Sequence, residues 1–96
     1  MIWTQEALEQ VIEIEDYIAT GNPERAAKFV DQLVENTESI SNNPYVGRVV
    51  PEIANPEIKE LIFHKYRIVY RLNEKRIEIL TVFEGHRLFR IDEINL

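Results

Sequence analysis

Cysteine is absent from this chain of 96 residues, and histidine and glycine are scarce, with two and three copies. The missing cysteine excludes disulfides and thiolate metal sites, and two distant histidines do not form a ligand pattern. No apolar run approaches the roughly 20 residues of a membrane span, and the N-terminus lacks a signal-peptide pattern. The sequence therefore predicts no metal and no cofactor, a cytoplasmic location, and one domain over residues 1–96.

Basic residues are unevenly distributed. Residues 1–43 carry nine acidic side chains and only two basic ones, Arg25 and Lys28, whereas residues 44–96 carry nine basic and eight acidic ones. The net charge is −6. Nucleic acid repels an acidic protein over long range, so the composition does not favour general nucleic-acid binding. The acids of the first half are expected to solvate helix faces.

The first half has the spacing of two helices. Thr4 is a good N-cap, and Thr20-Gly21 is expected to end the first helix with the glycine in a left-handed conformation. Asn22 then caps a second helix that ends at Asn42-Asn43-Pro44. The short connection predicts an antiparallel helical hairpin. The predicted apolar stripe of the first helix comprises Leu8, Val11, Ile12, Ile18 and Ala19, and further core residues are expected at Trp3, Tyr17 and Phe29.

The second half changes to the period of strands. Strands are expected over residues 59–64, 66–71 and 76–83, with an edge strand at residues 1–3. Tyr66, Ile68 and Tyr70 should meet the helices, while Arg67 and Arg71 should lie on the open, solvated face. The predicted fold class is α+β, with the N-terminal antiparallel helical hairpin packed on one face of a small antiparallel β-sheet. Residues 87–96 fit a strand or a last helical turn equally.

Arginines on the predicted sheet are the main candidates for binding. Arg67 and Arg71 would lie roughly 7 Å apart on one strand face. That spacing suits one phosphate or two carboxylates of an acidic peptide. The alternative is a solvated strand face that is paired with Glu78 on the neighbouring strand.

Two further arginines and a histidine are candidates outside the strands. Arg48 either folds over the sheet to bind a partner, or pairs with Glu52 or Glu60 as a structural arginine. His86 could act as a general acid or base near neutral pH, and Arg87 could contact an anion. No serine or cysteine nucleophile constellation and no phosphate-binding glycine loop is present.

An ordered set of segments resembles the RelE/ParE superfamily of bacterial toxins from type II toxin–antitoxin modules. The resemblance covers nearly the whole chain and is nearest to the ParE-like branch, because of the long helical hairpin and the proline–glycine–arginine turn. The segments that carry it are Trp3 to Ile18, Asn22 to Ala27, Pro44-Tyr45-Val46-Gly47-Arg48, Lys59-Glu60-Leu61, Tyr66-Arg67-Ile68-Val69-Tyr70 and Val82 to Arg87.

The resemblance implies a toxin that inhibits DNA gyrase by binding and is neutralised by a cognate antitoxin in a hetero-oligomer. RelE-like members of the superfamily instead cleave mRNA in the ribosome, which would make Arg67 and Arg87 catalytic. A third alternative is a non-toxic relative that only binds its antitoxin. In the ParE-like reading, the residues that contact the target or the antitoxin are Arg48, Arg67, Arg71, His86 and Arg87.

Overall fold

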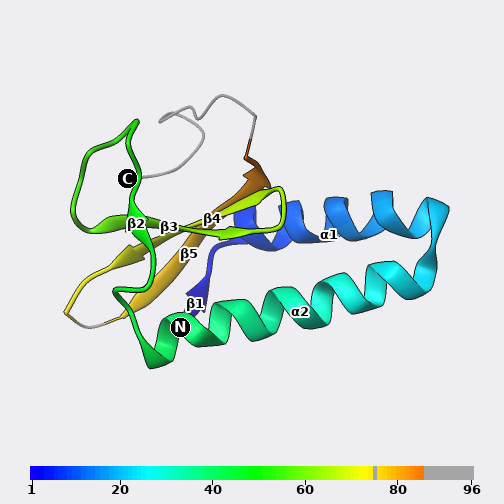
Figure 1. Cartoon of the computed structure of the whole chain (residues 1–96), viewed down its shortest axis with the longest axis horizontal. Helices are drawn as coiled ribbons and strands as arrows, with labels where there is room; N and C mark the ends of the chain where they lie inside the picture. Colours follow the sequence, from blue (N-terminus) through cyan, green and yellow to red (C-terminus); the bar gives the residue numbers. More distant parts are fainter. Residues whose placement is uncertain (75, 86–96) are drawn as a thin grey trace.

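The computed structural model describes residues 1–74 and 76–85. Two long helices are followed by the main strands of a sheet, and a very short strand precedes the helices (Figure 1). None of the helices in these residues has the length and hydrophobicity of a membrane span. The elements are β1 (Ile2–Trp3), α1 (Gln5–Gly21), α2 (Pro23–Asn42), β2 (Arg48–Val49), β3 (Ile58–Phe63), β4 (Tyr66–Leu72) and β5 (Ile77–Glu84).

Helix α1 begins where the sequence predicts, because Thr4 caps it. The Thr4 hydroxyl oxygen accepts a hydrogen bond from the Ala7 backbone N–H at 3.1 Å. The same hydroxyl donates to the Leu80 carbonyl at 3.0 Å, and the Thr4 backbone N–H donates to the Ile79 carbonyl at 3.1 Å. The cap therefore also attaches the start of α1 to β5.

The junction of the two helices differs from the prediction at Gly21. Gly21 is the last helical residue of α1, and no described glycine has a positive φ. Asn22 instead adopts an extended conformation, with φ −161°, and its backbone N–H donates to the Ile18 carbonyl at 2.9 Å. Its side-chain oxygen accepts from the Arg25 N–H at 3.1 Å. One extended residue thus ends α1 and caps α2, so no left-handed glycine is needed.

The sheet has the strand order β1-β5-β4-β3-β2. Strands β2 to β5 pair antiparallel, as predicted, and β1 adds a parallel edge strand beside β5. Arg48–Val49, which the sequence placed in a turn, forms the edge strand β2. A register shift at Val69/Tyr70 leaves Leu80 of β5 without a paired residue on β4. The predicted α+β fold is confirmed, with a mixed rather than purely antiparallel sheet.

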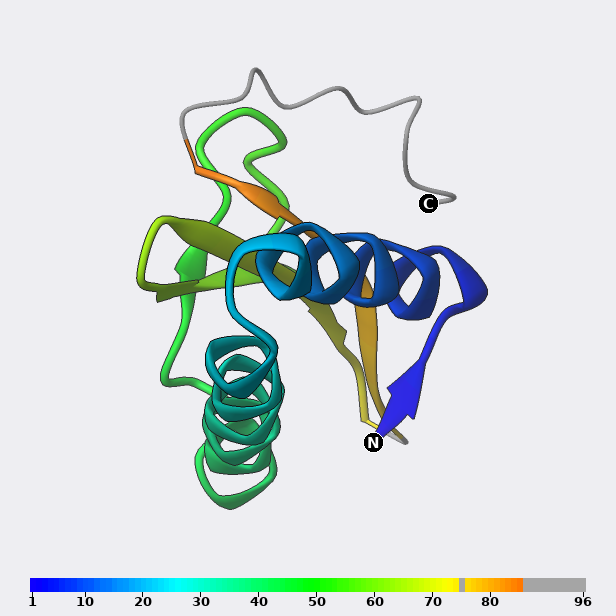
Figure 2. The ribbon, with the colours of Figure 1, turned by 90° about the vertical axis from the view of Figure 1, so that its right-hand side faces the viewer.

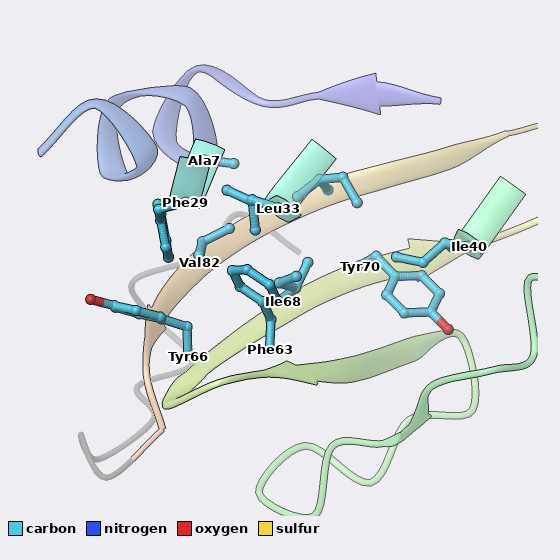
Figure 3. Packing of buried hydrophobic residues seen from close by; sticks show 10 residues of the cluster. Ala7, Phe29, Leu33, Ile40, Phe63, Tyr66, Ile68, Tyr70 and Val82 are labelled. Atoms are coloured by element: carbon cyan, nitrogen blue, oxygen red, sulfur yellow. The ribbon is translucent and has the colours of Figure 1, made fainter. Parts of the chain in front are cut away.

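The main core lies between the helical hairpin and one face of the sheet. Tyr66, Ile68 and Tyr70 point toward the helices, which confirms the predicted alternation along β4 (Figure 3). Phe29 of α2 contacts both Phe63 and Tyr66, with ring centroids 5.4 and 5.3 Å apart. The remaining buried members of this cluster are Ala7, Leu33, Ile40, Ile79 and Val82.

Helix α1 uses a different apolar stripe from the predicted one. Val11 and Ile18 pack against the core, as expected, but they do so with Ala7 and Ile14. These four residues follow the helical spacing i, i+4, i+7, i+11. The same spacing is found on a second face of the helix, at Leu8, Ile12, Glu15 and Ala19. The sequence alone therefore does not show which of the two faces is buried. Exposed apolar side chains, contrary to the prediction, are found at Leu8, Ile12 and Tyr17.

The other face of the sheet is covered by the connection between β2 and β3. This connection runs over residues 50–57 and lies across the strands from α2 (Figure 2). Its Val50 is fully buried and its Ile53 packs against the same cluster. The sequence predicted that this face is open to solvent, and that prediction is wrong. The cluster beneath the connection contains Val50, Ile58, Val69, Leu80 and Phe83.

Candidate functional site

Arg67 lies at the centre of a cluster of charged residues beneath the connection between β2 and β3, residues 50–57. Its side chain points away from the helices, as the alternation along β4 predicts, and the guanidinium carbon lies 5.3 Å from the Phe83 ring centroid. However, Arg67 is only 6% exposed, which corrects the expected solvated position. The burial follows from the covering connection, which brings an acidic side chain from outside the sheet.

Two glutamates occupy the hydrogen-bond donors of the Arg67 guanidinium. Glu52, from the covering connection, accepts in a bidentate manner from Nη1 at 2.8 Å and from Nη2 at 2.9 Å. Glu60 of β3 accepts from Nε at 2.6 Å. A planar guanidinium suits this fork geometry, and charge-assisted hydrogen bonds of this kind are the strong ones. Arg67 therefore joins β4 both to β3 and to the covering connection.

Glu60 also accepts a hydrogen bond from a second arginine, Arg48. The Arg48 Nε donates to Glu60 Oε2 at 2.7 Å, across the β2–β3 pair in which the two residues are direct partners. The Glu60 side chain is fully buried, while the Arg48 side chain is 66% exposed. Of the alternatives for Arg48, pairing with Glu60 is therefore observed. We call Arg48, Glu52, Glu60 and Arg67 the arginine–glutamate cluster.

Within the arginine–glutamate cluster, Glu52 and Arg67 stabilise each other's charged forms. Hydrogen bonding from Arg67 lowers the pKa of Glu52 to about 2. The hydrogen bond with Glu52 in turn raises the pKa of Arg67 above its ordinary value. The two formal positive and two formal negative charges balance. No buried side-chain polar atom in the described residues is left without a hydrogen-bond partner, so the cluster works as a closed structural unit.

A tyrosine on the other face of β4 fixes the turn that precedes β2. The Tyr70 hydroxyl donates to the Pro44 carbonyl at 2.9 Å and accepts from the Gly47 N–H at 2.9 Å. Burial raises the pKa of Tyr70. A Cβ atom at position 47 would lie 2.5 Å from the Tyr70 hydroxyl oxygen and 2.7 Å from the Glu60 carbonyl oxygen. Glycine is therefore required here by close approach. The Tyr70 contacts have no direct signal in the sequence, because they join residues 23 and 26 positions apart.

Comparison with known proteins agrees with this architecture. A family model described as the ParE toxin of the type II toxin–antitoxin system parDE matches residues 1–89. The chain belongs to the ParE toxin family. A solved structure of the chromosomal ParDE toxin–antitoxin system from P. aeruginosa is similar, with a TM-score of 0.70 and 26% sequence identity over 85% of this chain and 90% of that one. A comparison with curated proteins found no significant match.

Three candidate residues of this ParE-family chain remain, namely Arg71, His86 and Arg87. Arg71 shares a face with Arg67, as predicted, and lies opposite Glu78 of β5 in the antiparallel register. It is partly exposed. His86 and Arg87 lie outside the described residues. The structure thus links Arg48 and Arg67 through their shared partner Glu60. From the sequence, pairing with Glu60 was only one of the alternatives for Arg48.

The described part of this ParE-family chain contains no recognisable metal site. No group of three or more histidine, cysteine, aspartate or glutamate residues there could hold a metal ion. Both carboxylates of the arginine–glutamate cluster accept hydrogen bonds from arginine, and the lowered pKa of Glu52 keeps that carboxylate without a proton at neutral pH. The chemistry that the cluster supports is rigid positioning of Arg48 at the edge of the sheet.

Proposed function

We propose that this chain is a type II toxin of the ParE kind that inhibits DNA gyrase by binding and is neutralised by a cognate antitoxin. The observation that carries the proposal is the engagement of Arg67 by Glu52 and Glu60. A nuclease that cleaves mRNA through the ribose 2′-hydroxyl needs cations free to stabilise the charge on the phosphorane. Arg67, the first candidate for that role, is instead neutralised inside the protein.

The charge of the whole molecule supports the same choice. A net charge of −6 disfavours docking into ribosomal RNA, because the protein meets repulsion before any specific contact forms. Inhibition of a protein target requires no catalytic group. It requires an exposed surface with residues that can supply binding energy.

The segment before and within β2 offers such a surface. Tyr45 is 75% exposed, and Val46 and Val49 are also exposed, near the largely exposed side chain of Arg48. Lys59 extends over the Tyr45 ring, 5.9 Å from its centroid. Tyrosine and arginine are enriched among the residues that dominate binding energy at protein interfaces. We infer that this surface contacts the target or the antitoxin.

The function is tested by following thymidine and methionine incorporation side by side after induced expression in bacteria. Gyrase inhibition predicts an early fall in thymidine incorporation with methionine incorporation spared, and inhibition of supercoiling by the purified chain. Early loss of methionine incorporation would overturn the proposal in favour of mRNA cleavage. Undiminished growth with soluble protein accumulating would point to a relative that only binds its antitoxin.

A variant of the exposed arginine tests whether Arg48 belongs to the binding surface. Arg48→Ala leaves Glu60 paired with Arg67, so the fold should persist, and inhibition of supercoiling should weaken by about tenfold, as for a single interface residue of moderate importance. Arg76→Ala is the matched control, because Arg76 is also half-exposed and pairs with a glutamate, Glu78, at 3.4 Å. Equal inhibition by both variants would remove Arg48 from the binding surface.

A further inference from the structure

A second feature of the molecule lies apart from the arginine–glutamate cluster, at the free end of the helical hairpin. A cleft of about 810 Å³ opens between the α1–α2 junction and the turn that joins β3 to β4. Figure 1 shows that this turn and the hairpin end point in the same direction. None of the described residues that line the cleft is acidic.

Basic side chains from both halves of the chain meet at this cleft. Arg25 and Lys28 reach it from α2, and His64 and Lys65 reach it from the β3–β4 turn. Arg25 and Lys28 are the only two basic residues among the first 43, which also carry nine acids. The fold thus gathers the scarce positive charge of the helical hairpin at one place. A cleft lined by one sign of charge focuses the field toward a ligand of the opposite sign.

The inner part of the cleft is apolar. It is lined by Ile18, Phe29 and Tyr66, which also belong to or pack against the main core. Tyr17 stands at the same cleft with 74% of its surface exposed. The Lys65 ammonium lies 5.7 Å from the Tyr66 ring centroid, so charge and aromatic surface are adjacent. A concave apolar lining with a few convergent polar groups is the usual composition of a binding site.

We propose that this cleft binds a short acidic segment of a partner protein. One large apolar side chain of the segment contacts Ile18 and the exposed Tyr17, and its carboxylates pair with Arg25, Lys28 and Lys65. The site assigned here shares no residue with the surface around Arg48. It stands independently of the identity of the toxin's target, because it follows from the lining of the cleft alone.

The surroundings of the cleft favour a short peptide over nucleic acid. Exposed acids flank the basic residues, with Glu13 and Asp16 on α1 and Glu24 and Asp31 on α2. Glu84 also lies 4.0 Å from the Lys65 ammonium. A nucleic-acid strand that continued beyond the cleft would place phosphates against these carboxylates. A peptide that ends within the cleft, or continues with uncharged residues, avoids that repulsion.

The test is a titration of the purified full chain into a fluorescein-labelled peptide rich in glutamate with a central phenylalanine, followed by anisotropy. We expect saturable binding that weakens with salt. A peptide with glutamine in place of glutamate, and one with alanine in place of phenylalanine, should each bind about tenfold more weakly or worse. Absence of binding by the acidic peptide, or equal binding by the glutamine peptide, would overturn the proposal.

The location is tested by reversing charge within and outside the cleft. The double variant Arg25→Glu/Lys28→Glu should weaken binding by at least about tenfold. Acidic residues near the start of a helix are compatible with its dipole, so α2 should still form. For a matched control, the single variant Arg25→Glu is compared with Arg76→Glu, which changes the net charge equally outside the cleft and should stay within about twofold of the wild type. Equal losses in both variants would exclude the cleft as the site.

Two further measurements complete the test. Arg25→Gln/Lys28→Gln removes the charges without adding new ones, and it serves if the charge-reversal variant is poorly folded by circular dichroism. A single-stranded thymidine oligonucleotide that binds more tightly than the acidic peptide, with the same dependence on Arg25 and Lys28, would assign the cleft to nucleic acid and overturn the proposal. Supercoiling assays report separately on the proposed toxin function.

Discussion

At the scale of single residues, Glu60 is the point where Arg48 and Arg67 meet. Its side chain is fully buried, and each of its two carboxylate oxygens accepts a hydrogen bond from one of these arginines. Breaking a buried ion pair by removing one member is much more damaging than removing an exposed pair, because the remaining charge is left in a poorly solvating environment. This asymmetry makes the arginine–glutamate cluster testable by mutation.

Replacing the buried arginine should strongly destabilise the protein. Arg67→Met is expected to lower the free energy of unfolding by about 3–5 kcal/mol, measured by urea denaturation, because Glu52 and Glu60 lose their shared partner. Arg76→Met, which removes a half-exposed pair with Glu78, should change it by less than about 1 kcal/mol. The double variant Arg67→Met/Glu60→Gln should recover part of the loss. Similar unfolding midpoints for the two single arginine variants would contradict this account.

Glu52 adds a dependence of stability on pH. Its pKa in the folded protein is about 2, below the ordinary 4.5. A lowered folded-state pKa means that its contribution to stability is present above about pH 4.5 and is lost as the pH falls toward 2. Thermal unfolding followed across this window should show a steeper decline for the wild type than for Glu52→Gln. If the melting temperatures of the two proteins fell in parallel with pH, Glu52 would not be the source of the pH dependence.

The position of Arg67 also shows where reasoning from the sequence stops. The alternation of residues along β4 predicts which face each side chain takes, because that depends only on the local backbone. Whether the face is solvated depends on Val50, Ile53 and Glu52, which come from an irregular segment with no periodic signal. Burial of Arg67 was therefore not predictable, although its orientation was.

At the scale of elements, Gly21 and Gly47 have opposite roles. Gly21 is helical and has no atom within 4 Å of the place where a Cβ would lie, whereas the same position at Gly47 is occupied by Tyr70 and by the Glu60 backbone. A larger residue therefore fits at position 21 without steric conflict, but not at position 47.

A matched pair of substitutions distinguishes these roles. Gly21→Ala should raise the free energy of unfolding by about 0.5–1 kcal/mol, because alanine is favoured over glycine in a helix. Gly47→Ala should lower it by about 1–3 kcal/mol through steric conflict with Tyr70 and the β3 backbone. Both changes are read from thermal or urea unfolding. A destabilising Gly21→Ala would instead favour the left-handed conformation expected from the sequence.

The elements themselves were predictable to different degrees. The caps at Thr4 and Asn22 follow from local hydrogen bonding, so the starts of both helices agree with the sequence. The strands β1 and β2 have only two residues each and exist through pairing with distant partners, which leaves little local pattern. The buried side of α1 was predicted only in part, because apolar residues occupy two of its faces.

At the scale of the whole molecule, acidic residues outnumber lysine and arginine by 17 to 11. We expect that the purified chain does not retard a short DNA duplex in gel electrophoresis at physiological ionic strength, since a net charge of −6 opposes phosphate contacts. A basic DNA-binding protein provides the positive control. A shift that appears at low protein concentration and disappears with added salt would contradict the expectation.

The pairing of β1 with β5 has a consequence for how the protein is made. Trp3 and Thr4 pair with or bond to β5, which is the last in sequence of the described strands. The helical hairpin leaves the ribosome early, but the sheet that buries its apolar face is complete only when Glu84 has emerged. Contacts between such distant segments form late and slowly. The apolar face of the hairpin therefore stays uncovered until β5 has been made, and the folded surfaces of the described residues form only after that point.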